Sequence, residues 1–256
     1  MTIAVIGGTG MVGSEVVRRL AGGDHEVRIL SRRPPAPAVP GTSHHRIDLR
    51  SREGIDEALT GVDTVVDVAN ERKAARKILV DGTADLLERC RAASVGHYVG
   101  ISIVGCERVG LDYYVAKAAQ EEVIRNAPVG WSLLRATQFH ELLDFLFTTT
   151  AKFRFSPVAG IPVQPIAATV VAERLARIAA GEPTRATDQI AGPQVETLKA
   201  LSRTWRAARG RRAVPLPVRL PGKTGRALRD GALTDPSSAL PGPSFGDWLE
   251  THRPAA

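Results

Sequence analysis

Apolar and polar residues follow two alternating patterns along the first half of the chain. Short apolar runs predict strands at residues 2–6, 26–30, 45–49, 64–68, 97–103 and 130–134. Amphipathic stretches lie between them and predict helices at 10–21, 51–59, 74–93 and 112–126. Alternation of this kind is typical of an α/β fold in which helices cover both faces of a doubly wound parallel sheet.

A glycine-rich loop joins the first predicted strand to the first predicted helix. Gly7, Gly10 and Gly13 have G-x-x-G-x-x-G spacing at this junction. Gly7 permits a tight turn, Gly10 lets the backbone approach a pyrophosphate, and Gly13 lets the helix pack on the strand. The helix start offers N–H groups to the anion, so the loop predicts a dinucleotide site. The other loop residues assigned to that site are Thr9, Met11 and Val12.

The pattern becomes less regular after about residue 150, where prolines divide the chain into short pieces. Helices are still predicted at 167–180, 195–209 and 244–250. Ligands of open α/β sheets bind beyond the carboxyl ends of the strands. We therefore expect a single compact unit: a Rossmann-like dinucleotide-binding core over residues 1–150, and a small, less regular substrate-binding lobe over residues 151–256, packed on the core.

Composition narrows the possible partners. The net charge is +7, but the basic residues are spread out without interleaved aromatics, apart from a local cluster at 206–212 that lacks a nucleic-acid-binding motif, so no nucleic-acid partner is expected. The absence of an 18-residue apolar run or a leader-like start predicts no membrane partner and a cytoplasmic location. Cys90 and Cys106 are interpreted as reduced thiols. No metal site is expected, because the adjacent His44 and His45 would point to opposite faces of a strand.

The end of the second predicted strand bears on the choice of dinucleotide. Ser31, Arg32 and Arg33 lie where an NAD site would carry an acidic residue for the ribose hydroxyls. Two guanidiniums can instead hold a 2′-phosphate, which favours NADP(H) as the cofactor. The alternative interpretation is a solvated turn in an arginine-rich protein.

Two later strand ends are also expected near the cofactor. Asp48 and Leu49 would lie beside the adenine, although Asp48 could equally begin a helix. Ala69 and Asn70 follow the fourth predicted strand, where a small residue leaves room for the cofactor ribose.

A second group of residues points to acid–base chemistry. Tyr113 and Lys117 are four residues apart on a predicted helix and so share one face. A lysine ammonium near a phenol favours the phenolate, which makes tyrosine a usable general acid or base. Ser102 ends a strand upstream, and its hydroxyl could bond a substrate carbonyl. An ordinary amphipathic helix is the alternative when this spacing occurs alone.

These motifs together resemble the short-chain dehydrogenase/reductase superfamily, specifically its atypical NmrA-like NAD(P)-binding branch. The resemblance covers nearly the whole chain and rests on Gly7-Gly-Thr-Gly-Met-Val-Gly13, Tyr98-Val-Gly-Ile-Ser-Ile-Val-Gly105, Tyr113-Tyr-Val-Ala-Lys117, Ala119-Gln-Glu-Glu122, Leu134-Arg-Ala-Thr-Gln-Phe139, and the ending with Phe245, Trp248 and Leu249. It implies that Tyr113 donates a proton to a carbonyl, that Lys117 binds the nicotinamide ribose, and that Ser102 polarises the substrate oxygen. It also assigns to the cofactor site Ile101, Ala136, Thr137, Gln138 and Phe139, the last four along the nicotinamide.

The resemblance implies NADPH-dependent reduction of a carbonyl, a quinone or a related small, hydrophobic electrophile. One departure concerns the helix asparagine of the superfamily's catalytic tetrad, which has no counterpart within residues 78–83. Two other functions therefore stay open: a non-catalytic NADP(H)-binding redox sensor, and a redox-neutral isomerase or cyclase that retains the nucleotide. The substrate and the oligomeric state, monomer or homodimer, are not specified.

Two expectations concern the segment after the nicotinamide residues. His140 and Glu141 could face the substrate, although a surface helix turn is favoured for them. Aromatic residues also concentrate here, and core packing is expected to claim most of them: Phe139, Phe145, Phe147, Phe153 and Phe155.

Overall fold

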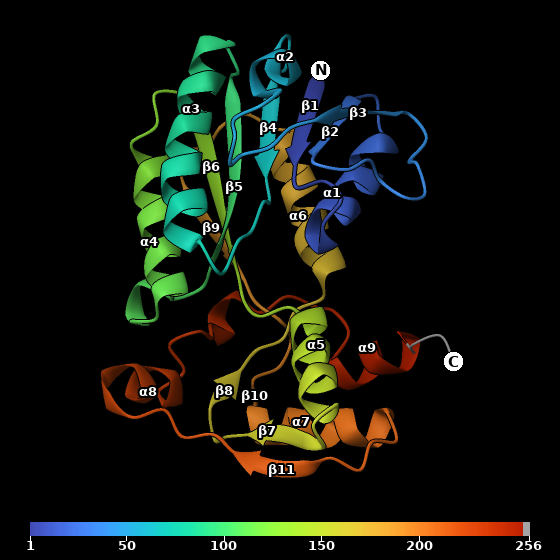
Figure 1. Cartoon of the computed structure of the whole chain (residues 1–256), viewed down its shortest axis with the longest axis vertical. Coiled ribbons are helices and arrows are strands. Elements are labelled where there is room, and N and C mark those ends of the chain that lie inside the picture. The colour runs from blue at the N-terminus through green and yellow to red at the C-terminus, as the bar shows by residue number, and fades with distance from the viewer. Residues whose placement is uncertain (253–256) are drawn as a thin grey trace. The chain divides into compact units, whose positions relative to one another are not determined.

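The apolar runs of the first half form a seven-stranded sheet in a computed structural model that describes residues 1–252 (Figure 1). The strands, in spatial order, are β3 (Thr42–Arg46), β2 (Glu26–Ser31), β1 (Thr2–Ile6), β4 (Thr64–Asp67), β5 (His97–Ile103), β6 (Gly130–Ala136) and β9 (Thr187–Ile190). The pairs from β3 through β5 are parallel. This order, which reverses between β1 and β4, confirms the predicted Rossmann-like α/β fold.

Helices cover both faces of the sheet. Figure 1 shows α3 (Gly82–Ala92) and α4 (Asp112–Arg125) on one side, and α1 (Met11–Ala21) and α6 (Ala168–Ala179) on the other. Their apolar faces and the buried strands form the main core, because parallel strands under helices are shielded from water on both sides.

The chain divides into two compact units that alternate along the sequence. Unit 1 comprises Met1–Ser102, Asp112–Arg135 and Val171–Asp188; unit 2 comprises Ile103–Leu111, Ala136–Val170 and Gln189–Ala256. Residues 253–256 of the predicted substrate-binding portion lie outside the described residues. The substrate-binding role of residues 151–256 stays a prediction.

Unit 2 is built mainly from helices and two small sheets. Its elements are α5 (His140–Ala151), β7 (Phe155–Val158), β8 (Pro162–Val163), β10 (Glu196–Thr197), α7 (Leu198–Ala208), β11 (Val214–Pro217), α8 (Gly222–Arg229) and α9 (Phe245–Thr251). The short helices η2 (Cys106–Arg108) and η3 (Pro236–Ser238) complete it. An apolar core joins Leu143 and Phe147 of α5 to Trp205 of α7 and to Phe245 and Trp248 of α9.

Several boundaries differ from the predictions. β3 begins and ends three residues earlier than expected, because its pairing with β2 fixes its register. α2 (Ile55–Leu59) begins four residues late, directly after Gly54, whose φ of +74° is incompatible with a continuing helix. The predicted helix at 74–93 opens instead with a π-helical segment, η1 (Arg76–Asp81).

The expectations for the aromatic segment were partly wrong. Phe147 is fully buried and Phe139 is half-buried, but Phe145, Phe153 and Phe155 are exposed. Phe145 lies on the face of α5 opposite to Leu143 and Phe147, which its helical position dictates. His140 is fully buried, so the favoured surface position was also wrong for that residue.

Candidate cofactor and active site

The glycine-rich loop adopts a backbone path that side chains would block. Gly7 has a φ of +75°, and its N–H bonds to the carbonyl of Leu30 at 3.0 Å. The N–H of Gly10 bonds to the carbonyl of Gly7 at 2.8 Å. A Cβ atom on Gly13 would lie 2.2 Å from the Gly7 oxygen, so a side chain there would displace the loop. Thr9 and Met11 are exposed at the loop, and Val12 is buried beneath it.

The start of α1 fits a pyrophosphate. Gly10 is its N-cap, and within residues 1–252 no side chain caps the helix. The first turn carries no acidic residue, so the positive end of the helix dipole is not neutralised there. A dinucleotide pyrophosphate would therefore find backbone N–H groups here, and Gly7, Gly8 and Gly10 offer it no Cβ atoms.

The two arginines after β2 are exposed and have no ion-pair partner among the described residues. The buried Ser31 hydroxyl donates to the carbonyl of Arg33 at 2.5 Å and lies 3.1 Å from Nε2 of His44. Ser31 thus fixes the turn that carries Arg32 and Arg33, while both guanidiniums stay available to an anionic ligand.

Asp48 organises a turn rather than the start of a helix. Its carboxylate accepts from the backbone N–H of Arg50 at 2.8 Å, and its backbone pairs with Glu53. α2 begins only at Ile55. Leu49 is half-buried against the core of unit 1. The assignment of Asp48 and Leu49 to the adenine stays a prediction.

The end of β4 lies between the glycine loop and the predicted proton donor. A Cβ atom on Gly7 would be 3.1 Å from the Cα of Ala69, so the two backbones are in close contact. The Tyr113 hydroxyl donates to Oδ1 of Asn70 at 3.0 Å. The guanidinium of Arg72 lies 5.3 Å from the centre of the Tyr113 ring. These contacts gather the loop, Ala69, Asn70 and Tyr113 in one part of unit 1.

Lys117 is buried one helical turn beyond Tyr113 on α4. Its Nζ donates to the carbonyl of Ile101 at 3.0 Å and to Oε1 of Gln120 at 2.9 Å. The ammonium is thereby tied to the end of β5, and Ile101 and Lys117 are brought together as expected for one site.

Ser102 takes part in a hydrogen-bond network around the buried carboxylate of Glu121. Its hydroxyl bonds to the carboxylate of Glu121, which also accepts from Arg135 at 2.9 and 2.6 Å. Burial would raise the pKa of Glu121, but the hydrogen bonds from Arg135 and Ser102 outweigh it and lower the pKa. The expected contact of Ser102 with a substrate oxygen stays a prediction.

The predicted nicotinamide segment, Ala136–Phe139, is held within unit 2 by its own backbone and side chains. The carbonyl of Ala136 accepts from Val104, and Oγ1 of Thr137 accepts from the N–H of Gly192 at 3.1 Å. Gln138 donates through Nε2 to the carbonyl of Leu233 at 2.8 Å. Phe139 is the N-cap residue of α5. The segment is therefore rigidly seated in its unit.

A family model described as NAD(P)H-binding matches residues 7–173, which is more than half of the chain and includes the glycine loop. The chain belongs to the NAD(P)H-binding family. The match supports the coarse function, an oxidoreductase-type family that binds NAD(P)H. The matched range also includes Tyr113 and Lys117, but the match assigns no role to an individual residue.

Two relatives illustrate the range of this family. The (4-alkanoyl-5-oxo-2,5-dihydrofuran-3-yl)methyl phosphate reductase of Streptomyces griseus is 30% identical over 77% of this chain and 70% of its own length. The photosystem II assembly factor Ycf39 of Cyanophora paradoxa is 23% identical over 55% of this chain and 46% of its own length. The family thus includes a named reductase and a named assembly factor.

Solved structures show the same fold at lower identity. The NADPH complex of the quinone oxidoreductase QOR2 from Escherichia coli has a TM-score of 0.81 at 17% identity, and covers 97% of this chain and 99% of that one. The dTDP-glucose 4,6-dehydratase DesIV from Streptomyces venezuelae, with NAD bound, has a TM-score of 0.77 at 22% identity and covers 98% and 95%.

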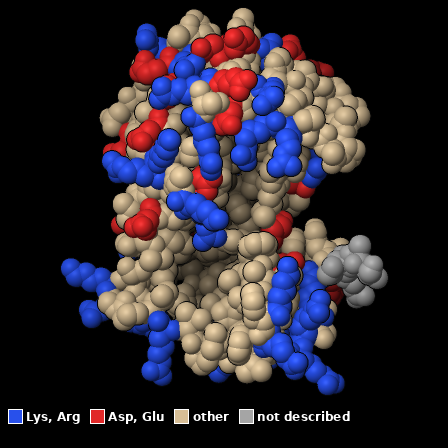
Figure 2. Space-filling view, in the orientation of Figure 1, with Lys and Arg blue, Asp and Glu red and all other residues tan. Residues whose placement is uncertain are grey.

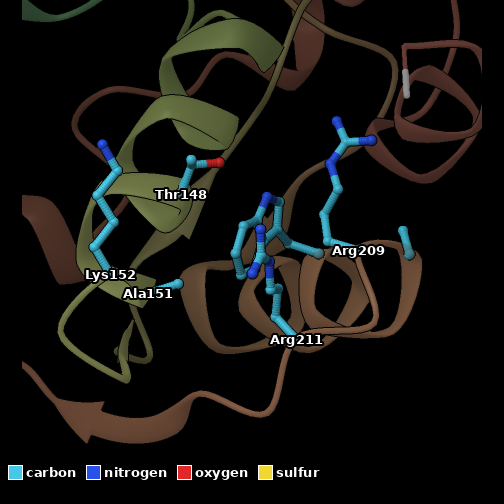
Figure 3. Close-up of a pocket in the computed structure, with 7 residues that line it drawn as sticks. Thr148, Ala151, Lys152, Arg209 and Arg211 are labelled. Carbon is cyan, nitrogen blue, oxygen red and sulfur yellow. The ribbon is translucent and has the colours of Figure 1, made fainter. Parts of the chain in front are cut away.

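Unit 2 contains a pocket at some distance from the predicted nicotinamide segment, Ala136–Phe139. It has a volume of about 480 Å³ and is lined by Thr148 and Lys152 of the α5 segment and by Trp205, Arg209 and Arg211 of the α7 segment (Figure 3). Lys152 is twelve residues after the start of α5, roughly 18 Å along the helix from the nicotinamide segment. This pocket is therefore not part of the predicted cofactor site.

Within residues 1–252 no helix is long and apolar enough to cross a membrane. No group of three or more His, Cys, Asp or Glu side chains in the same residues could hold a metal ion.

Sequence reasoning missed three polar residues close to the site: Arg72, Gln120 and Asp67. Gln120 follows Lys117 by three residues, so helical spacing could have placed the two side chains together. Arg72 lies in an irregular connection and Asp67 within an apolar strand, and neither position gave a periodic signal.

Proposed function

We propose that this chain is an NADPH-dependent oxidoreductase that reduces a carbonyl, a quinone or a related small electrophile, with Tyr113 as the proton donor. The observation that carries the proposal is the position of Tyr113. Its hydroxyl is bonded to Asn70 beside the glycine loop, one helical turn from the Lys117 ammonium. The similarity to a Streptomyces reductase supports the same reaction class.

When bound, NADPH would supply the hydride, and the protein would supply position and a proton. The Tyr113 hydroxyl donates to Asn70, and a substrate carbonyl oxygen would compete for that hydrogen. The Lys117 ammonium, one helical turn away, and the Arg72 guanidinium, 5.3 Å from the ring centre, would stabilise the negative charge left on Tyr113 by proton donation. Lys117 would also bind the nicotinamide ribose, and the Ala136–Phe139 segment would line the nicotinamide.

The preference for NADPH over NADH is part of the proposal. It rests on the exposed guanidiniums of Arg32 and Arg33 after β2, which have the planar geometry that a 2′-phosphate needs. We further propose that residues 151–256 bind the small, hydrophobic substrate.

The test is NADPH oxidation with a panel of ketones, quinones and an alkanoyl dihydrofuranone phosphate of the kind named for the Streptomyces relative. Tyr113→Phe should lower kcat by about 10²- to 10⁴-fold and leave NADPH affinity unchanged, because it removes only the transferable proton. Tyr114→Phe, which alters the neighbouring tyrosine on the same helix, is the matched control and should keep full activity. Equal activity of the two variants would overturn the assignment.

A second function is favoured by the similarity to photosystem II assembly factors. A non-catalytic NADP(H)-binding protein would bind NADPH tightly, oxidise none across the panel, and be unaffected by Tyr113→Phe. A redox-neutral isomerase or cyclase would convert substrate while all of the nucleotide is recovered in its original form.

A further inference from the structure

A chain of buried hydrogen bonds leads from the Lys117 ammonium into the core of unit 1. Lys117 donates to Oε1 of Gln120 at 2.9 Å, and Nε2 of Gln120 donates to Oγ1 of Thr83 at 2.9 Å. Thr83 bonds to the hydroxyl of Tyr98, which donates to Oδ2 of Asp67 at 2.6 Å. All five side chains belong to buried residues.

The two ends of this network determine the directions of its bonds. Because Lys⁺ can only donate, Gln120 must present its oxygen to Lys117 and its NH₂ group to Thr83. At the other end, Tyr98 gives its single hydrogen to Asp67, so the bond between Thr83 and Tyr98 must be donated by Thr83. The second oxygen of Asp67 accepts from the N–H of Ala69 at 3.0 Å. Both carboxyl oxygens are therefore acceptors, as in an ionised carboxylate.

We propose that Gln120, Thr83 and Tyr98 connect Lys117 to Asp67 as a single polarised unit, in which Asp67 is the buried counter-charge and Gln120 is the positioning residue that orients the Lys117 ammonium. A protonated Asp67 would add a donor that meets the Tyr98 hydroxyl. A neutral Lys117 would remove the constraint on Gln120. The two ends are therefore linked by the shared hydrogen bonds and by the attraction between the Lys117 ammonium and the Asp67 carboxylate.

The surroundings of the chain support this link. Burial raises the pKa of Asp67 by more than the hydrogen bonds from Tyr98 and Ala69 and the charge of Lys117 lower it. Cys90 also faces this carboxylate, but burial raises the pKa of its thiol to about 12, so it contributes no charge at neutral pH. Within the described residues, the cation that lowers the pKa of Asp67 is the Lys117 ammonium.

The orienting role of Gln120 rests on the proposed function, since it concerns the placement of Lys117 beside the nicotinamide ribose. The helix asparagine of the superfamily tetrad is missing within residues 78–83, and Thr83 of that same stretch is a member of the chain. This sequence therefore connects its catalytic lysine candidate to the protein interior by a different set of side chains.

The linkage can be measured without substrate by NMR of the whole protein. As the pH is lowered, the ¹⁵Nζ signal of Lys117 should shift with the same midpoint as the carboxyl ¹³C signal of Asp67. In Gln120→Glu, which keeps the shape but cannot donate to Thr83, the Lys117 signal should no longer move at that midpoint. A Lys117 signal that ignores the Asp67 midpoint in the unaltered protein would overturn the proposal.

Two further variants keep the test decisive. Asp67→Asn removes the charge and should abolish the same Lys117 shift; if this variant does not fold, Gln120→Glu carries the test alone. Glu122→Gln, an exposed position on the same helix, is the matched control and should retain the shared midpoint.

Activity then separates this inference from the proposed function. If the chain is a reductase, Gln120→Glu should lower kcat about tenfold, a larger change than its effect on the KM for NADPH, because a displaced ammonium affects the reaction more than the binding. An unchanged kcat would overturn the orienting role. If Lys117 and Asp67 share a midpoint by NMR but the protein oxidises no NADPH, the hydrogen-bond link is supported and the reductase proposal is refuted.

Discussion

The imidazole of His140 lies in the apolar core of unit 2 with only one ring nitrogen bonded. Nε2 donates to the carbonyl of Pro243 at 3.1 Å, and Phe245 and Trp248 each lie 5.7 Å from the ring centre. Within the described residues Nδ1 has no hydrogen-bond partner. A second proton on this ring would therefore be buried without an acceptor.

This environment predicts a pH dependence of folding. Burial lowers the pKa of His140 to about 4, more than the Pro243 carbonyl raises it, and the charge of His252 lowers it further. Below the ordinary value of 6.5 the unfolded chain binds the proton more strongly than the folded one. Above pH 6.5 the ring is neutral in both states, and the free energy of unfolding has its full value. As the pH falls from 6.5 to about 4, the free energy of unfolding decreases by on the order of 3 kcal/mol.

Urea unfolding between pH 4 and 7 measures this effect. His140→Phe should reduce the slope of the unfolding free energy against pH, because it removes the titrating ring and keeps an aromatic surface. A slope that survives His140→Phe would contradict the assignment to this residue.

The two arginines after β2 support a prediction on cofactor choice. Replacing both Arg32 and Arg33 by alanine should weaken NADPH binding by about 10- to 100-fold and NADH binding by much less, since only NADPH has a 2′-phosphate. Arg91→Ala, which alters an exposed arginine on α3, should change neither affinity. Equal losses for both nucleotides, measured by titration calorimetry, would contradict the 2′-phosphate role.

At the scale of elements, α9 depends on a capping box at its first turn. The Ser244 hydroxyl accepts from the N–H of Asp247, whose carboxylate accepts from the N–H of Ser244. This cap fixes the helix that carries Phe245 and Trp248 into the core of unit 2.

Ser244→Ala should therefore lower the free energy of unfolding by about 1 kcal/mol, the usual cost of losing an N-cap. Thr251→Ala, at the opposite end of the same helix, should cost less than about 0.5 kcal/mol. Thermal unfolding followed by circular dichroism compares the two. A larger loss for Thr251→Ala would show that the cap is not what holds α9.

Elements with a local signal could be predicted from the sequence. The strands of unit 1 and the helices at α1 and α4 follow from apolar periodicity, and the glycine loop follows from its spacing. β9 could not be predicted, because Thr187–Ile190 has too few apolar residues to signal a strand. Its position depends on residues that are distant in the sequence. Just before β9, the N–H of Arg185 donates to the carbonyl of Trp131, and the N–H of Leu133 donates to the carbonyl of Ala186.

The parts of the candidate site that have a local sequence signal could also be predicted. Motif spacing put Tyr113 and Lys117 on one helix face, and the end of the fourth predicted strand pointed to Asn70. In the structure the Tyr113 hydroxyl donates to Asn70, and Lys117 is one helical turn farther along α4. Motif spacing could not indicate that Ser102 bonds to Glu121, because side-chain partners across a sheet and a helix depend on tertiary packing.

At the scale of the whole molecule, charge is unevenly divided between the units. Unit 2 contains 14 Lys and Arg against 8 Asp and Glu, so it carries +6 of the net +7. Residues 197–229 include ten of these cations and no acidic residue. Figure 2 shows this as blue side chains with few red ones in the lower part of the view. Such a surface attracts anionic solutes at low ionic strength.

The alternation of the units along the chain predicts the result of truncation. A chain of residues 1–150 would lack Val171–Asp188, which supplies the fully buried Val171, Ala172 and Leu175 of α6 to unit 1. We expect it to lose cooperative unfolding, because the part of the sheet face that α6 covers would be left exposed. Calorimetry provides the measurement. A sharp transition close to that of the full chain would show that residues 1–150 fold independently.

The three tryptophans of this chain make the two units separately visible by fluorescence. All three indoles are buried: Trp131 in unit 1, and Trp205 and Trp248 in unit 2. Emission from a buried indole moves to longer wavelength when water reaches it. A chain with Trp131→Phe would report only on unit 2, and one with Trp205→Phe and Trp248→Phe only on unit 1. The natural sequence thus contains its own optical probes of whether the two units melt in one step or in two.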